Sequence, residues 1–562
     1  MRILLVASAF NSLSQRVFAE LRERGHTMAV HLGPDPEELR AAVRAHAPDL
    51  LLAPMLKSVI PPDVWSAHTC LVVHPGPPGD RGPSALDWAI HEGAEHWGVT
   101  VLQADEVMDG GPVWTSARCP VPPVGKSDLY RNEVADAALE AVLLAVERFA
   151  SRTYVPQPQY GRGWRVPDHT RPYFDQSLRR VDWAADPTAT VVRKLRAAHS
   201  QPGVLDELLG GEWYLHGGHP EDGLRGVPGE LLATRAGAVC RATVDGAVWI
   251  PELRPRRRPG GPATFKLPAV LALGGLLPRL PEVPAPPTLP PGRRTWTDLA
   301  YREQGPVGFL RFSFPGGAMS TSHCRRLLDA YRSACDRPTS VLVLGGGRDF
   351  FSNGIHLNVI EAAADPAEES WRNINAIDDL VAAVLTTTDR LVVAALGGNA
   401  AAGGVMLALA ADDVWCRAGV LLNPHYRLMG LYGSEYWTYT LPRRVGEAAA
   451  RRLTEQALPV TAEAALRLGL VDRVVPSTPG DFGAAVGGLA VSLATSGRLQ
   501  ERIAAKKAAR ERDEARRPLA AYRAAELERM RRNFFGPGEP YHALRSAFVR
   551  KQPVSGAPPQ LR

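Results

Sequence analysis

A histidine and an aspartate lie at two turns of one segment and could together transfer a proton. His74 ends the apolar run Cys70–His74 and is followed by Pro and Gly, and Asp109 precedes two glycines. Histidine titrates near neutral pH, and a neighbouring carboxylate can set its tautomer and charge. Loops at the carboxyl ends of strands in an open α/β sheet are where such groups usually lie. We therefore expect His74 and Asp109 to act together, against the alternative that His74 is a hydrogen-bonded core residue.

Glycines crowd two turns later in the chain. One turn contains Gly354 and precedes Ile355, and the other contains Gly403 and Gly404. Small residues let backbone N–H groups approach an oxygen closely, as an oxyanion hole requires. We expect the N–H groups of Ile355 and Gly403 to be such donors.

Residues 425–439 hold groups suited to acid–base chemistry within an aromatic stretch. His425, Glu435 and Tyr439 are the candidates. A glutamate buried among aromatic residues should have a raised pKa suited to proton transfer. For any single tyrosine a purely structural place in the core remains an equal alternative.

The elements that position the first pair have the pattern of a parallel sheet with covering helices. Apolar runs at 3–7, 50–54 and 70–74 alternate with helical patterns at 15–24 and 37–45. We expect an α/β multidomain protein that begins with a Rossmann-type open sheet over residues 1–155. A small β-rich domain is expected at 156–275, where short β-like runs are separated by Gly and Pro.

A proline-rich segment separates the two halves. Seven prolines fall between Pro278 and Pro291, which predicts an extended linker over residues 276–297. Buried strands at 308–312, 341–344 and 391–395 and helices at 324–334 and 374–387 predict a second α/β domain over 298–490. Residues 491–562 are expected to form a basic helical extension.

Length and composition limit the class of protein. A chain of 562 residues favours three or more domains, and a net charge of +6 is small for this length. Six scattered cysteines suggest neither a disulfide framework nor a structural zinc site, and no metal is expected. The opening apolar run is too short for a signal peptide, and no stretch is long enough to span a bilayer. We expect a cytoplasmic protein without a nucleic-acid or membrane partner.

The stretch from Leu71 to Trp114 resembles the formyltetrahydrofolate-dependent formyltransferases. His74-Pro75 and Asp109-Gly110-Gly111 match that family's signature. The resemblance implies formyltetrahydrofolate as the formyl donor, a role for His74 and Asp109 in a tetrahedral intermediate, and a cofactor site that includes Asp80, Arg81, Gly110 and Gly111.

One position departs from that family. Its asparagine falls at Val72, which cannot donate a hydrogen bond to a formyl oxygen. Either the oxyanion is stabilised differently or the site is inactive. We hypothesise that Asn11, in the loop after the first strand, supplies the missing amide.

The segment from Phe350 to Gly446 resembles the crotonase (enoyl-CoA hydratase/isomerase) superfamily, with its ββα repeats. The resemblance implies coenzyme A as a ligand near Gly354 and Gly404, and Ile355 and Gly403 as the oxyanion-hole donors. The hydratases' two glutamates fall at Met406 and His425, so addition of water to a double bond is not expected.

The basic extension could bind the phosphates of CoA. From Glu501 to Arg532 it has eleven Lys or Arg against six Asp or Glu. Lys506, Lys507 and Arg510 are the candidates, and a solvated helix face is an equal alternative.

The whole chain resembles the HypX/HoxX family of [NiFe]-hydrogenase maturation factors, with NPHYRLMGLYGSEYWTYTLPRRVG as the most distinctive segment. The resemblance implies that a formyl group passes from formyltetrahydrofolate to CoA, and that formyl-CoA then breaks down to CO. Small-molecule substrates and hydrogenase assembly proteins are the implied partners, and a cavity joining the two sites is expected. Alternatives are an amine formyltransferase whose second half only binds CoA, a fused acyl-CoA hydratase or isomerase, and a catalytically dead assembly scaffold.

Overall fold

The computed structural model describes residues 1–159, 169–285, 288–290, 292–345, 347–552 and 556–561. The chain divides into two units. The first unit consists of Met1–Arg256, Pro268–Pro281 and Pro553–Arg562. The second unit consists of Arg257–Leu267 and Glu282–Gln552. Residues 160–168, 286–287 and 291, which belong to the expected middle domain and linker, lie outside the described residues.

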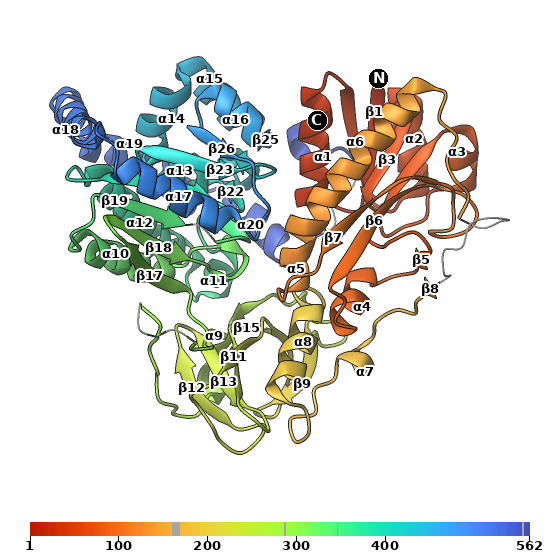
Figure 1. Cartoon of the computed structure of the whole chain (residues 1–562), viewed down its shortest axis with the longest axis horizontal. Coiled ribbons are helices and arrows are strands. Elements are labelled where there is room, and N and C mark those ends of the chain that lie inside the picture. The colour runs from red at the N-terminus through yellow and green to blue at the C-terminus, as the bar shows by residue number, and fades with distance from the viewer. Residues whose placement is uncertain (160–168, 286–287, 291, 346, 553–555, 562) are drawn as a thin grey trace. The chain divides into compact units, whose positions relative to one another are not determined.

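The first unit begins with a six-stranded sheet in the order β2-β1-β3-β4-β6-β7 (Figure 1). The first four of these strands are parallel to one another, and β6 pairs antiparallel with both β4 and β7. Apolar runs form the central strands because both faces of the sheet are buried. The expected Rossmann-type open sheet is thus confirmed. Its strands are β1 (Arg2–Ala7), β2 (Thr27–Leu32), β3 (Leu50–Met55), β4 (Cys70–His74), β6 (His96–Gln103) and β7 (Val113–Pro120).

Helices follow the strands of this sheet. The side chain of Asn11 caps the first helix, and Asp35 with Pro36 starts the second, as N-terminal positions favour. The helices are α1 (Ser12–Glu23), α2 (Pro36–His46), α3 (Pro62–Ala67), α4 (Ala85–His91), α5 (Lys126–Leu129) and α6 (Ala135–Ser151).

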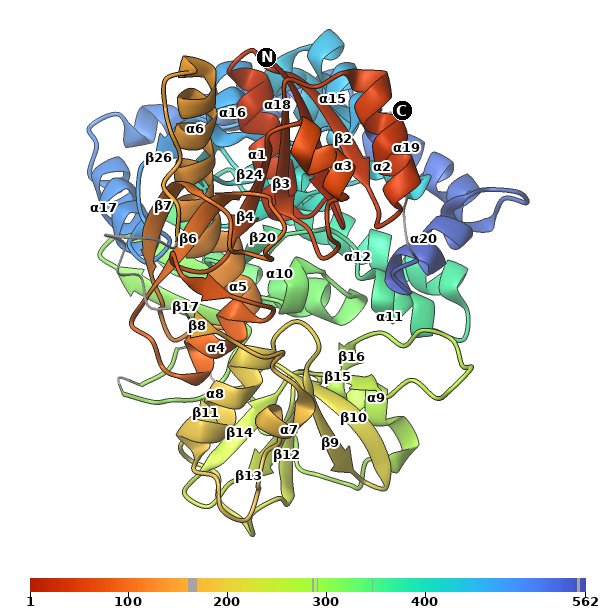
Figure 2. The ribbon, with the colours of Figure 1, turned by 90° about the vertical axis from the view of Figure 1, so that its right-hand side faces the viewer.

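The first unit also contains a small β-rich domain (Figure 2). Two four-stranded sheets have the orders β16-β15-β10-β9 and β11-β14-β13-β12. Val191 and Leu195 of α8 (Thr188–Ala198) pack into the core beneath these strands. The strands are β9 (Val204–Leu208), β10 (Gly211–His216), β11 (His219–Glu221), β12 (Leu231–Arg235), β13 (Ala238–Ala242), β14 (Ala247–Ile250), β15 (Glu252–Pro255) and β16 (Leu267–Pro268).

The second unit has the expected ββα repeat. In each repeat the first strand joins a six-stranded sheet, β17-β18-β19-β21-β23-β26, and the second joins a four-stranded sheet, β20-β22-β24-β25. The repeated strand pairs are β19 (Val341–Gly345) with β20 (Phe350–Ser352), β21 (Leu391–Leu396) with β22 (Asn399–Ala401), and β23 (Asp413–Arg417) with β24 (Leu421–Asn423). The remaining strands are β17 (Leu299–Gln304), β18 (Val307–Phe312), β25 (Val460–Thr461) and β26 (Arg473–Val475).

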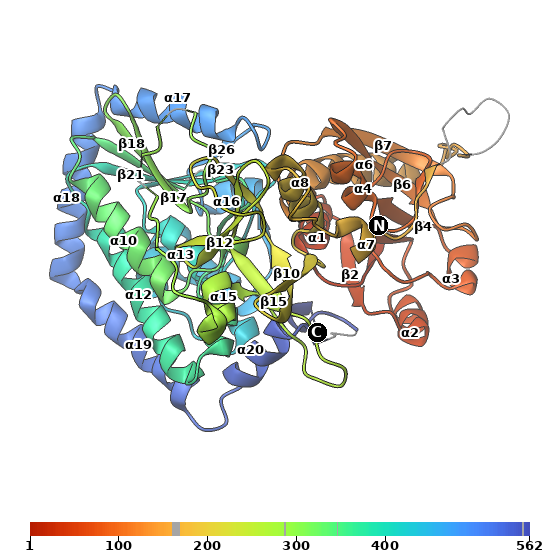
Figure 3. The ribbon, with the colours of Figure 1, turned by 90° about the horizontal axis from the view of Figure 1, so that it is seen from below.

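The helical tail packs on the second unit. Figure 3 shows α10 (Thr321–Cys335), α12 (Pro366–Thr386) and α19 (Leu519–Phe535) side by side. None of the helices in the described ranges has the length and apolar character needed to span a membrane. The other helices of this unit are α11 (Leu357–Ala362), α13 (Gly403–Leu409), α14 (Trp437–Val445), α15 (Glu447–Gln456), α16 (Ala462–Leu468), α17 (Phe482–Ala494), α18 (Leu499–Arg516) and α20 (Tyr541–Val549).

Candidate active sites

The first candidate site is built around the imidazole of His74. His74 is the last residue of β4 and is buried. Its Nε2 lies 2.9 Å from Oδ2 of Asp80, and its Nδ1 lies 3.6 Å from Oδ1 of Asp109. A histidine between two carboxylates can hold a proton on either nitrogen, so the ring is placed to accept a proton and pass it on.

Asp80 is the closer partner of His74. It lies in the two-residue strand β5 (Asp80–Arg81), which pairs with β8 (His169–Thr170). Its other oxygen, Oδ1, accepts a hydrogen bond of 3.0 Å from Nε of Arg171. A Cβ on Gly76 would lie 2.3 Å from the His74 Nε2 and 2.4 Å from the Asp80 Oδ2. Glycine at this position is therefore required for the pair to form.

Asp109 sits in a strained turn that faces the same histidine. Its φ of 54° is in the left-handed region, and its Oδ2 accepts a hydrogen bond of 3.2 Å from the N–H of Gly82. A Cβ on Gly111 would lie 1.9 Å from the carbonyl oxygen of Gln103, so only glycine fits there. The Asp-Gly-Gly sequence thus reflects the shape of the turn.

Gln159 joins the two loops of this site. Its Nε2 donates to the carbonyl oxygens of Asp109 at 2.9 Å and Gly111 at 2.8 Å, and its Oε1 accepts from the N–H of Gly79 at 2.9 Å. The side chain is buried. Gln159 therefore fixes the distance between the loop after β4 and the Asp109 turn.

Asn11 begins α1, in the loop after β1. Its Oδ1 accepts from the N–H of Ser14 at 3.0 Å, and its Nδ2 donates to the hydroxyl of Tyr130 at 3.1 Å. Both polar atoms therefore have structural partners, and the oxyanion role of Asn11 stays a prediction. The same holds for cofactor binding by Arg81 and Gly110.

The second candidate site is a small cavity in the second unit. Its volume is about 60 Å³. A cavity needs only about 10–15 Å³ of such volume to hold one water molecule, so there is room beside Glu435 for a one-carbon group with its oxygen. It is lined by Asn353, Ile355, Leu357, Ile374, Ala402, Gly403, His425, Tyr426, Met429, Leu431, Glu435 and Met530.

Glu435 is the carboxyl group that lines this cavity, and its proton affinity is strongly altered. It is buried, and its Oε2 accepts from the Tyr426 hydroxyl at 2.8 Å and from the Ser434 N–H at 3.0 Å. Burial, and next the charge of Asp378, raise the pKa of Glu435 to about 8 despite these two hydrogen bonds. This carboxyl can therefore take up and return a proton near neutral pH.

Small residues let the backbone approach the same carboxylate closely. A Cβ on Gly403 would lie 2.1 Å from Oε1 of Glu435, and one on Gly354 would lie 3.1 Å from the Gly403 nitrogen. Gly403 is the first residue of α13, where the N–H has no partner within the helix. Ile355 lines the cavity beside it. The two predicted donors and Glu435 are thus brought together, and a Cβ on Gly404 would clash with Ser352 instead.

The structure distinguishes between the other candidates of residues 425–439. His425 lines the cavity, and its Nδ1 bonds the carbonyl oxygen of Asn423 at 2.9 Å, so Nδ1 is the donor and Nε2 carries the free lone pair. Tyr439 is absent from the cavity lining, and its hydroxyl donates to Asp513 at 2.9 Å. Tyr426 is the tyrosine that meets Glu435.

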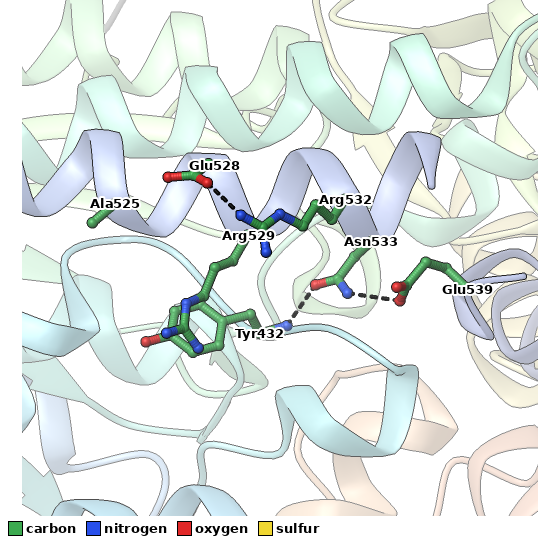
Figure 4. Close-up of a pocket in the computed structure, with 7 residues that line it drawn as sticks. All are labelled: Tyr432, Ala525, Glu528, Arg529, Arg532, Asn533 and Glu539. Atoms are coloured by element: carbon green, nitrogen blue, oxygen red, sulfur yellow. Dashed lines mark hydrogen bonds and ion pairs between the residues drawn. The ribbon is translucent and has the colours of Figure 1, made fainter. Parts of the chain in front are cut away.

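Helix α19 of the basic extension closes the wall of this site. Met530 lines the cavity, and Glu526 accepts hydrogen bonds from the N–H groups of Tyr436 and Thr438 at 2.9 and 2.8 Å. Asn533 accepts from the N–H of Tyr432 at 2.9 Å. On the outer side of this contact, the Arg529 guanidinium lies 4.5 Å from the centre of the Tyr432 ring, in an open pocket (Figure 4).

The predicted CoA-binding cations lie on α18. Lys506 donates to Oδ2 of Asp412 at 2.6 Å, Arg510 donates to the Tyr439 hydroxyl at 2.6 Å, and Lys507 is exposed. Two of the three are therefore engaged within the fold, and phosphate binding by this helix remains a prediction.

Three residues of these sites were missed from the sequence: Gln159, Asp378 and Tyr426 as the glutamate's partner. Tyr426 lies nine residues before Glu435 inside the stretch already singled out, and that proximity was the only available signal. Gln159 and Asp378 reach their sites from distant segments and had none.

Family models match three parts of the chain. Residues 2–146 match formyl transferase, residues 174–264 match the formyl transferase C-terminal domain, and residues 310–535 match enoyl-CoA hydratase/isomerase. Methionyl-tRNA formyltransferase of Myxococcus xanthus is 28% identical over 225 residues, 40% of this chain and 69% of that protein.

Two further relatives match along nearly the entire chain. The hydrogenase maturation factor HoxX of Bradyrhizobium diazoefficiens is 48% identical over 560 residues, 99% of this chain and 96% of that protein. The crystal structure of HypX from Aquifex aeolicus in complex with tetrahydrofolic acid has a TM-score of 0.95 at 45% identity, covering 100% of this chain and 98% of that one. The chain therefore belongs to the HypX/HoxX family of hydrogenase maturation factors.

Proposed function

We propose that this protein makes CO for the iron of a [NiFe] hydrogenase, using formyltetrahydrofolate as the carbon source and coenzyme A as the carrier. The observation that carries the proposal is the buried Glu435 carboxyl beside the Gly403 backbone, in a cavity of about 60 Å³. Such a site suits a formyl thioester. Relatives of the same family support the hydrogenase context.

In the first step, His74 manages a proton during formyl transfer. The CoA sulfur bonds to the formyl carbon, the bond from that carbon to the folate nitrogen breaks, and the thiol proton ends on that nitrogen. His74 can carry this proton because its ring lies between the carboxylates of Asp80 and Asp109. Asn11 or backbone N–H groups would stabilise the oxyanion.

In the second step, Glu435 moves the formyl proton to sulfur. Its carboxylate removes the proton from the formyl carbon, the carbon–sulfur bond breaks with its electron pair leaving on sulfur, and CO departs. The Glu435 carboxylic acid then returns the proton to the thiolate. The N–H groups of Ile355 and Gly403 would hold the formyl oxygen throughout. CoA is regenerated, so the net change is formyltetrahydrofolate to tetrahydrofolate and CO.

One CoA serving both steps must carry the formyl group on its pantetheine arm from one site to the other. A cavity joining the sites is part of this proposal. Lys506, Lys507 and Arg510 remain candidates for its phosphates, with Lys507 the most accessible of them. Hydrogenase assembly proteins are the proposed recipients of CO, in a cytoplasmic setting.

The test supplies formyltetrahydrofolate and CoA and measures both tetrahydrofolate release and CO capture by a haem reporter. His74→Ala is expected to abolish both products. Glu435→Gln is expected to keep tetrahydrofolate release and to lose CO, because only the second step needs this carboxylate. CO formation at the wild-type rate in Glu435→Gln would refute the assignment, and a formylated amine made without CoA would favour an amine formyltransferase instead.

A further inference from the structure

The turn that carries Glu435 has an unusual backbone. Glu435 and Tyr436 have φ values of 60° and 58°, so two consecutive non-glycine residues are left-handed. This conformation is unfavourable for a residue with a side chain and persists only where the surroundings hold it. The contacts that stabilise this turn therefore determine where the Glu435 carboxylate points.

Asp378, in the middle of α12, supplies the closest of these contacts. Its Oδ1 accepts from the N–H of Glu435 at 2.8 Å, and the hydroxyl of Ser434 lies 2.7 Å from each of its carboxylate oxygens. Asp378 is fully buried. The Asp378 carboxylate thus holds the backbone N–H of Glu435, the proposed base, and the hydroxyl of the residue before it.

Charged and titratable groups surround Glu435 from every neighbouring element. The cation among these groups is Arg523. Its Nε lies 3.7 Å from Oδ2 of Asp378, and it also pairs with the exposed Asp379. Carboxyl groups therefore outnumber cations around the turn. The groups are His425 and Tyr426 at the start of the 3-10 helix Tyr426–Met429, Asp378 and Asp379 from α12, Cys324 from α10, and Arg523 and Glu526 from α19.

The two buried acids titrate in sequence. Burial raises the pKa of Asp378 to about 6, and it raises the pKa of Glu435 further, to about 8. Between these values Asp378 is ionised while Glu435 still holds its proton. The Asp378 charge then opposes a second charge beside it, which makes the Glu435 carboxylate a stronger base when it does ionise.

We propose that Asp378 is a positioning residue for CO formation: it holds the left-handed turn so that the Glu435 carboxylate faces Gly403, and it places a negative charge beside that carboxylate. This inference rests on the proposed function for its catalytic consequence. The contact of Asp378 with the turn does not depend on it.

The test compares Asp378→Asn with Asp379→Asn in the full-length protein. Both changes remove one carboxylate charge from the same helix, but Asp379 is half-exposed and only pairs with Arg523. In Asp378→Asn the midpoint of the pH profile for CO formation is expected to move to lower pH by about one unit. Its plateau should fall, because a weaker base removes the formyl proton more slowly. Asp379→Asn should leave the midpoint in place.

A second readout needs no turnover. The infrared carboxyl band of Glu435, assigned by its loss in Glu435→Gln, is titrated in substrate-free protein. Its midpoint should also move to lower pH in Asp378→Asn. The Asp378 band should titrate below the Glu435 band in the wild type and should keep that midpoint in Glu435→Gln, because Glu435 is still protonated where Asp378 ionises. This order decides the matter if Asp378→Asn does not fold, since an Asp378 that titrates above Glu435 carries no charge when Glu435 ionises.

The outcomes separate the two proposals. If Asp378→Asn folds and neither midpoint moves, or if the Asp378 band titrates above the Glu435 band in the wild type, the role of Asp378 is overturned. A lower plateau with an unmoved midpoint means that Asp378 is only structural, which also overturns it. If the wild type makes no CO, the proposed function fails, while the infrared titrations still decide whether Asp378 controls Glu435.

Discussion

Replacing Tyr426 by phenylalanine tests whether Glu435 is the base for the formyl proton. The Tyr426 hydroxyl donates to Oε2 of Glu435 at 2.8 Å, and both side chains are buried. This hydrogen bond stabilises the ionised carboxylate and therefore lowers its pKa. Without it, the pKa of Glu435 should rise above about 8.

The size of the effect follows from the strength of the lost bond. A hydrogen bond to a charged group contributes about 1.5–3 kcal/mol, and one pKa unit corresponds to about 1.4 kcal/mol, so the expected rise is about one to two units. At pH 7 about one Glu435 in ten is ionised in the wild type, and a rise of one unit leaves about one in a hundred. CO formation at pH 7 should therefore fall about tenfold for each unit. The loss should be regained at high pH, because the reactive form is the ionised one.

The assay follows CO with a haem reporter during a single turnover, across about pH 6 to 10. Tetrahydrofolate release is measured in the same samples, so that a slow first step is recognised. Tyr331→Phe is the matched control, since it removes a buried tyrosine hydroxyl of the same unit that bonds the hydroxyl of Thr387 at 2.8 Å and no carboxylate. Tyr439→Phe should leave the midpoint unchanged, because that hydroxyl donates to Asp513. A midpoint that stays in place or moves to lower pH in Tyr426→Phe would refute the reasoning.

Three other substitutions separate the steps. Gly76→Ala should abolish tetrahydrofolate release without unfolding the protein, because its Cβ would lie 2.3 Å from Nε2 of His74; activity kept within about twofold would contradict the geometry of that pair. Gly403→Ala should spare tetrahydrofolate release and stop CO formation, because its Cβ would lie 2.1 Å from Oε1 of Glu435; equal losses in both products would count against it. Lys506→Met should lower the melting temperature, since it leaves a largely buried carboxylate without its cation, and should leave the KM for CoA unchanged; a raised KM at unchanged stability would favour the phosphate site instead.

Local sequence patterns were sufficient to predict the fold class and to single out some of the residues that the structure brings together. His74 ends an apolar strand and Asp109 precedes two glycines, so the strand and turn patterns were enough to identify both as candidate site residues. The Gly403 turn was equally visible, because only small residues fit where backbone donors approach a ligand. Glu435 was found because a charged residue inside an aromatic stretch is unusual.

The contacts that complete the sites were not predictable from local pattern. Asp80 reaches His74 because a two-residue strand pairs with β8, about ninety residues further along the chain. Gln159 and Asp378 are ordinary polar residues whose function depends on which loop their helix or segment meets. Periodicity gives the buried face of an element, but it does not give the partner that the face will meet.

The charge pattern of the tail shows the same limit. The run of Lys and Arg in residues 502–532 suggested phosphate binding, yet Lys506 bonds Asp412 and Arg523 pairs with Asp379. The same run of sequence contains Glu526, which is buried and accepts hydrogen bonds from the backbone of Tyr436 and Thr438. The tail's one deeply buried acid thus bears more directly on the site than its many exposed bases.

The electrostatics of the two sites differ in the way that the two proposed proton transfers require. The proposed formyl transfer moves a proton between sulfur and nitrogen, and the His74 ring can carry that proton because it lies between two carboxylates, with Arg171 behind one of them. A formyl C–H is a far weaker acid, so its removal needs a stronger base than an ordinary carboxylate. Burial and the nearby charge of Asp378 make Glu435 such a base. The burial that raises the pKa of Glu435 also keeps this carboxyl away from bulk water, so that the group proposed to break formyl-CoA into CO is not placed to direct its hydrolysis to formate.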